Sequence, residues 1–118
     1  MTDQDKDLLA TTAQRTFDIW QIKNEMRLRV LGISVIKTEM RLSHRLNLLS
    51  DTGRCNRAQL LQRLFISLEN LLGNDGVSGR TWLATYNSDL EAKPVDLLVS
   101  YNGIAKVCEY VDSYRTRC

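Results

Sequence analysis

The residue types that most often perform chemistry are few and scattered in this chain. His44 is the only histidine, and no second histidine stands at the spacing of a metal site. Cys55, Cys108 and Cys118 are odd in number and lack CxxC spacing, which indicates free thiols instead of zinc ligands or a disulfide framework. The acidic residues form no pair suited to acid–base catalysis, and no glycine-rich phosphate-binding motif occurs. We therefore expect a protein that is not an enzyme and that uses no metal or cofactor.

The elements that must position any binding residues are helices. The clearest one follows Asn56, a suitable N-cap, and its leucines recur every three or four residues as far as Leu72. Further helices are predicted over about 4–20, 35–49 and 78–85, after Asn24, from Pro94, and from about Asn102. No strand-like alternation is present. The prediction is an all-α fold, a compact bundle of about six helices.

Positive charge is concentrated in the middle of the chain. The net charge is only +2, but residues 21–63 hold nine basic and three acidic side chains. Within this segment, Leu31-Gly32-Ile33-Ser34 has the character of a tight turn between two helices, with Gly32 in a left-handed conformation. This layout predicts a helix-turn-helix-type region over residues 1–54. Its second helix would present four side chains to operator DNA: Lys37, Arg41, His44 and Arg45.

A single long helix is the alternative interpretation of this segment. Its apolar residues lie close to one stripe, and a glycine inside a helix costs only about 1 kcal/mol relative to alanine. Thr38 and Arg41 also occupy positions where a helix-turn-helix motif prefers apolar residues. Both interpretations stay open on the sequence alone.

Residues 80–107 carry the most distinctive pattern. A structural interpretation is sufficient for part of it: Trp82 and Leu90 as core residues, a loop over 86–89, and a helix that starts at Pro94. The ordered residues are Trp82-Leu83, Asn87, Leu90, Pro94, Leu97-Leu98, Gly103 and Val107. This set resembles the toxin-binding domain of Xre/MbcA/ParS-type antitoxins, and the resemblance extends over about residues 16–114. The chain departs from the family pattern at Tyr86, which replaces a proline, and at Glu91-Ala92, which replace two glycines.

The resemblance implies an antitoxin that neutralises a cognate protein toxin, and family toxins are often RES-domain enzymes that consume NAD. It places toxin binding in residues 55–118. The implied contact residues are Asn87, Lys93, Asp96, Asn102, Tyr114, Arg115 and Arg117. It further implies a homodimer, or a larger complex with the toxin, that also represses its own operon.

Two other functions fit the residues: a DNA-binding regulator of phage or plasmid type without a toxin, and an adaptor that oligomerises through the leucine-rich helix. The acidic start of the chain is unlike a signal peptide, and no stretch of roughly 20 apolar residues occurs. We therefore expect a cytoplasmic protein with no membrane contact.

Overall fold

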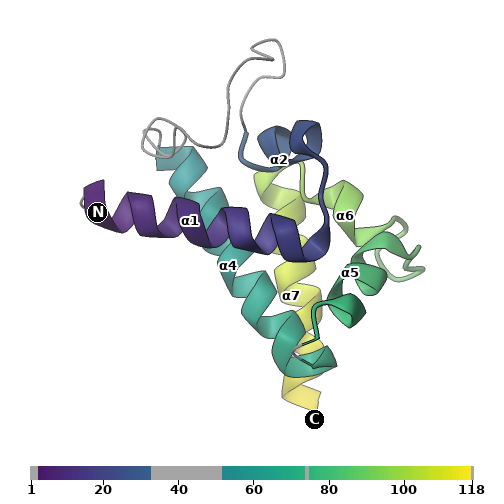
Figure 1. Ribbon diagram of the computed structural model, residues 1–118. Coiled ribbons are helices and arrows are strands. Elements are labelled where there is room, and N and C mark those ends of the chain that lie inside the picture. The colour runs from purple at the N-terminus through teal and green to yellow at the C-terminus, as the bar shows by residue number, and fades with distance from the viewer. Residues whose placement is uncertain (1–2, 33–51, 74, 118) are drawn as a thin grey trace.

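Two long helices form the centre of the computed structural model, which describes residues 3–32, 52–73 and 75–117. They are α4 (Thr52–Leu72) and α7 (Tyr101–Arg117), and they pack side by side (Figure 1). Their shared face is made of fully buried aliphatic side chains at helical spacing: Leu61, Leu64 and Leu68 from α4, and Ile104, Val107 and Val111 from α7. The leucine periodicity that predicted the central helix therefore marks the face that forms the core.

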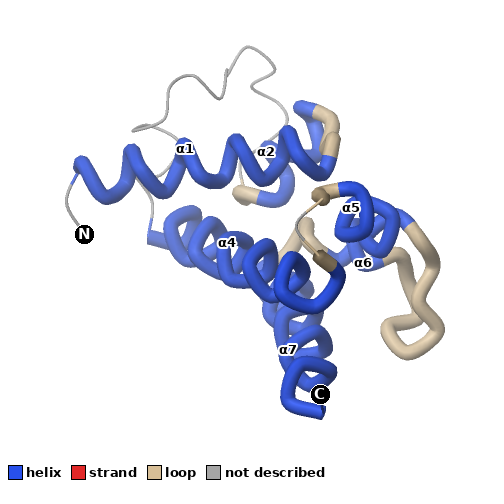
Figure 2. The backbone as a smooth tube through the Cα atoms, turned by 60° about the horizontal axis from the view of Figure 1, so that its bottom comes forward, coloured by secondary structure: helices blue, strands red, loops and turns tan. Residues whose placement is uncertain are grey.

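Helix α1 (Asp3–Trp20) lies beside α4 and completes this core (Figure 2). Phe17 is fully buried, and the Trp20 ring lies 5.7 Å from that of Phe65 on α4. The helix ends in a Schellman motif: the Ile22 amide donates to the Phe17 carbonyl at 3.0 Å, and the Gln21 amide donates to that of Asp18 at 3.1 Å. The chain thereby reverses direction with Gln21 in a left-handed conformation, φ 55°.

Helix α2 (Asn24–Val30) follows directly and buries Leu28 and Val30. Asn24 was expected to cap this helix from outside, but it is the first helical residue, and Lys23 occupies the capping position. Gly32 has φ +77°, which confirms the left-handed conformation predicted for it. A Cβ at Gly32 would lie 2.9 Å from the guanidinium carbon of Arg57 on α4, so the turn also packs closely on that helix.

Two short helices, α5 (Val77–Ala84) and α6 (Pro94–Leu97), lie beside the α4–α7 pair. The segment between them is closed by a single antiparallel bridge, in which Asn87 and Ala92 exchange backbone hydrogen bonds of 3.0 and 3.3 Å. Pro94 occupies the first turn of α6, as predicted, because its missing N–H has no helical partner there. This arrangement brings α5 and α6 onto one side of the core (Figure 1).

The all-α prediction is confirmed, since the described residues form six helices and no strand. One boundary was wrong: α4 begins at Thr52, so Asn56 lies inside the helix and does not cap it. Gly53 also lies within α4, where an internal glycine costs only about 1 kcal/mol relative to alanine. The predicted helix over 35–49 and residues Ile33 and Ser34 of the predicted turn lie outside the described residues. The division into regions 1–54 and 55–118 stays a prediction.

Candidate functional site

Asn87, the first of the implied toxin-binding residues, stabilises the turn between α5 and α6. Its side-chain oxygen accepts hydrogen bonds from the backbone amides of Asp89 at 2.9 Å and Leu90 at 3.1 Å. Such an Asx turn fixes the backbone without help from a proline. Leu90 is buried beneath the turn. Asn87 therefore holds the shape of the segment that a partner would meet.

The remaining implied contact residues lie in two groups. Lys93, Asp96 and Asn102 are exposed around α6 and the first turn of α7. Tyr114, Arg115 and Arg117 belong to the last turns of α7, about 18 Å further along its axis at 1.5 Å per residue. The side chains of Arg115 and Arg117 lie outside the described ones. Tyr114, one of these six residues, packs in a cluster of aromatic side chains.

That cluster is aromatic and spans α5 and α7. The rings of Trp82 and Tyr110 stack with centroids 6.3 Å apart and an interplanar angle of 21°, and the Tyr114 ring meets Tyr110 edge-on at 5.0 Å. Leu71 and Val111 complete a hollow of about 150 Å³. We call these five residues the aromatic surface. Trp82 was predicted as a core residue, but it is only half-buried, so one side of the cluster faces outward.

A carboxylate fixes the edge of the aromatic surface. The Tyr110 hydroxyl lies 2.6 Å from an Asp89 carboxylate oxygen, to which it donates, and 3.1 Å from the Tyr114 hydroxyl. The hydrogen bond to Asp89, with a smaller effect from Tyr114, raises the pKa of Tyr110 to about 12. The turn and α7 are thus tied together by side chains that remain accessible.

Tyr110 and Asp89 were missed by sequence reasoning. The spacing of Tyr110 and Tyr114 carried a usable signal, because side chains four residues apart lie on one face of a helix. The contribution of Asp89 depends on the fold of the turn, which brings it to a residue 21 positions later in the chain.

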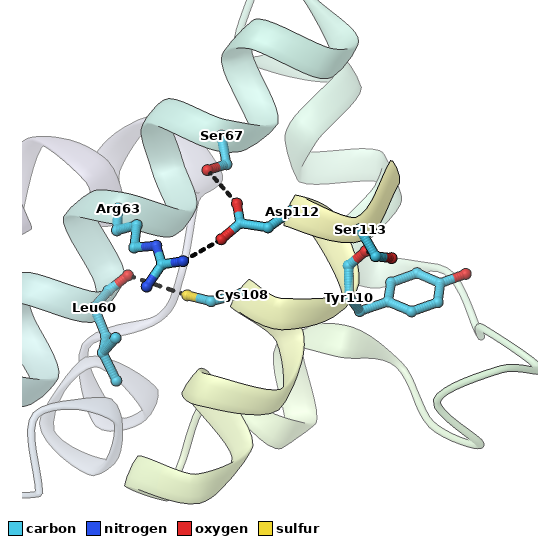
Figure 3. A network of polar contacts seen from close by, with 7 residues as sticks. All are labelled: Leu60, Arg63, Ser67, Cys108, Tyr110, Asp112 and Ser113. Atoms are coloured by element: carbon cyan, nitrogen blue, oxygen red, sulfur yellow. Dashed lines mark hydrogen bonds and ion pairs between the residues drawn. The ribbon is translucent and has the colours of Figure 1, made fainter. Parts of the chain in front are cut away.

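Polar contacts on the other side of α7 set its position against α4 (Figure 3). Asp112 pairs with the Arg63 guanidinium and accepts a hydrogen bond from the Ser67 hydroxyl at 3.1 Å. The Cys108 thiol donates to the Leu60 carbonyl at 3.4 Å. Burial raises the pKa of this thiol to about 11, and the side chain packs between α7 and α4. These contacts hold the aromatic residues of α7 at a fixed angle.

Much of the described basic segment is engaged within the molecule. Arg27 pairs with Asp18 at 2.7 Å, Arg29 pairs with Glu25 at 3.2 Å, and Arg63 pairs with Asp112. The Arg57 guanidinium donates to the Val99 carbonyl at 3.3 Å. The predicted DNA contacts Lys37, Arg41, His44 and Arg45 lie outside the described residues.

Over residues 3–32, 52–73 and 75–117, histidine, cysteine, aspartate and glutamate side chains do not gather in a group that could hold a metal ion. None of the helices in this part of the chain combines the length and apolar character needed to cross a membrane. In comparisons with known proteins, no family model and no curated protein matches the chain.

Proposed function

We propose that this protein is an antitoxin that neutralises a cognate protein toxin through the aromatic surface and the adjoining end of α7. The aromatic surface carries the proposal, because tryptophan and tyrosine dominate the binding energy of many protein interfaces. Here Trp82, Tyr110 and Tyr114 are held in place by ring packing and by Asp89, so little side-chain entropy would be lost on binding.

The geometry of the C-terminal motif supports the proposed relationship to Xre/MbcA/ParS-type antitoxins. Asn87 closes the turn, Pro94 starts α6, and Leu90 and Leu98 are buried below them. Glu91 occupies a position at which the family pattern has glycine, and its φ is 57°, a conformation that favours glycine. The backbone at this position therefore suits the family pattern although the side chain does not.

The proposed toxin is of the RES-domain kind, an enzyme that consumes NAD. In this proposal, the last turn of α7 enters the cleft that binds the phosphate-bearing cofactor, and Arg115 and Arg117 take the place of cofactor contacts. Arginine is suited to this role because its guanidinium group matches phosphate-binding geometry. The aromatic surface beside this turn would contact the rim of the cleft.

The test is inhibition of the toxin encoded beside this protein, measured as NAD consumption with increasing antitoxin. Tyr114→Ala should weaken inhibition about tenfold or more, which corresponds to a loss of at least 1.4 kcal/mol. Tyr86→Ala is the matched control, because Tyr86 is an exposed aromatic residue outside the aromatic surface. Removal of residues 115–118 separately tests the role of the arginines. Unchanged inhibition by both the Tyr114 variant and the truncated protein would refute the proposal.

A DNA-binding regulator is the second candidate, favoured by the excess of basic residues over 21–63. Its test is binding to the upstream operator at several salt concentrations, since neutralised phosphates make affinity fall steeply with salt. Replacement of Lys37, Arg41, His44 and Arg45 by alanine should abolish this binding. Lys106→Ala is the control, because Lys106 is an exposed basic residue on α7, outside the basic segment.

A further inference from the structure

A second surface lies on the side of α5 that faces the end of α1. The end of α1, the turn into α2, and parts of α2, α5 and α6 enclose a hollow of about 220 Å³. An adjoining hollow of the same volume runs along α2 and shares Lys23 and Met26 with the first. We call the two together the α2 groove. It is separate from the aromatic surface, because α5 contributes Arg80, Leu83 and Ala84 to the groove but Trp82 to the aromatic surface.

The floor of the α2 groove is apolar and its rim is basic. Ile22, Met26, Leu83 and Val95 line the first hollow, together with Trp20. Lys23 and Arg80 stand among these residues, and Arg29 lines the second hollow. Among the described residues that line the two hollows, Glu25 is the one acidic residue, and it is paired with Arg29. The groove therefore combines apolar contact area with positive charge.

The basic side chains remain available to a ligand. Lys23 is exposed, and Arg80 uses its Nε–H to donate to the Ile19 carbonyl at 3.3 Å, which orients the guanidinium group at the rim. The Arg29–Glu25 pair is exposed, and pairs of this kind contribute little stability. A carboxylate from a partner can therefore replace Glu25 at small cost.

The backbone at the rim is strained. Gln21 lines the first hollow with φ 55°, a left-handed conformation that costs a residue other than glycine about 1 kcal/mol. Glycine would satisfy the same Schellman motif without this cost. Gln21 thereby places an exposed polar side chain at the rim of the first hollow.

We propose that the α2 groove binds an acidic, apolar peptide segment of a partner protein. One large apolar side chain would enter the first hollow, and carboxylates beside it would pair with Lys23, Arg80 and Arg29. The volume of about 220 Å³ is smaller than typical sites for whole small molecules, roughly 300–1,000 Å³, but suits a single anchoring side chain. Met26 lies between the hollows, and methionine adapts readily to different apolar partners.

The probe is a short synthetic peptide in which glutamate alternates with leucine, acetylated and amidated, titrated into the full-length protein and followed by backbone amide NMR. A second peptide replaces every glutamate with lysine. We expect the glutamate peptide to shift the amides of residues 20–29 and 80–84 and to bind at least about tenfold more tightly than the lysine peptide. Affinity for the glutamate peptide should also fall as salt is raised.

Charge reversal at the rim provides the decisive variant. Lys23→Glu should weaken binding of the glutamate peptide about tenfold, whereas Lys106→Glu, which reverses an exposed charge on α7, should not. Equal binding of the two peptides, no binding of the glutamate peptide, or shifts confined to the aromatic surface would overturn the proposal. Because this assay contains no toxin, its outcome is independent of the proposed antitoxin activity.

Discussion

The α-carbon of Gly103 packs directly against the carbonyl oxygen of Leu97. A Cβ at this position would lie 1.8 Å from that oxygen, far inside any permitted contact. The amide of the same glycine donates to the Ser100 hydroxyl at 3.0 Å, which places Ser100 as the N-cap of α7. Glycine is therefore required at position 103 because α6 approaches the first turn of α7 so closely. The requirement does not come from a left-handed backbone conformation at this residue.

Gly103→Ala should lower the free energy of unfolding by about 3 kcal/mol, because the clash is with backbone and can be relieved only by moving α6. Chemical denaturation followed by circular dichroism measures this change. Gly79→Ala is the matched control: its Cβ would meet the Trp20 indole nitrogen at 3.4 Å, an ordinary contact, and alanine favours the helix. Equal stability of the two variants would contradict the close approach.

Glu91→Gly should raise the free energy of unfolding by about 1 kcal/mol, because glycine adopts the left-handed conformation of residue 91 without steric cost. Glu91→Ala removes the same charge but keeps the backbone strain, and it should bring no comparable gain. Thermal unfolding of the three proteins gives the comparison. If the alanine and glycine variants were equally stable, the φ of 57° would carry no strain.

The helical architecture was predictable because its signals are local. The leucines of α4 recur at helical spacing, Pro94 suits the first turn of a helix, and Gly32 takes the left-handed conformation of a helix end. The start of α4 was not predictable, because Thr52 and Gly53 are recruited into the helix against their own preferences.

The candidate site was predictable only in part, since it depends on contacts between distant segments. Tyr114 was expected at a binding surface, but its neighbours Trp82 and Asp89 come from α5 and from the turn before α6. Sequence spacing shows that Tyr110 and Tyr114 share a helix face, yet it cannot show which segment covers that face. The half-burial of Trp82 likewise follows only from the fold, which stacks its ring on Tyr110 of α7 and leaves part of it exposed.

Tyr110 should titrate at a higher pH in the native protein than an ordinary tyrosine side chain does. Its hydroxyl donates to Asp89 in the folded state, which raises its pKa from 10.0 to about 12. The protonated hydroxyl therefore stabilises the fold below pH 10, and this contribution is lost as the pH rises from about 10 to about 12. Tyrosinate is measured by its ultraviolet absorbance as the pH is raised. The difference between the unmodified protein and the Tyr110→Phe variant gives the titration of Tyr110. Asp89→Asn should lower its pKa towards 10; an unchanged titration would show that the Tyr110–Asp89 hydrogen bond is absent in solution.

The two buried thiols should be slow to react with a disulfide reagent in the folded protein. The pKa of Cys108 is raised to about 11 by burial, so roughly one molecule in a thousand carries this thiolate at pH 8. Cys55 is also buried. In a Cys118→Ser variant, the two remaining thiols should therefore react slowly with the disulfide reagent at pH 8. When denaturant unfolds the chain, their reaction rate should rise to that of free cysteine. Rapid reaction of both thiols without denaturant would mean that the seam between α4 and α7 opens readily, which the packing of Leu61, Leu64 and Val107 opposes.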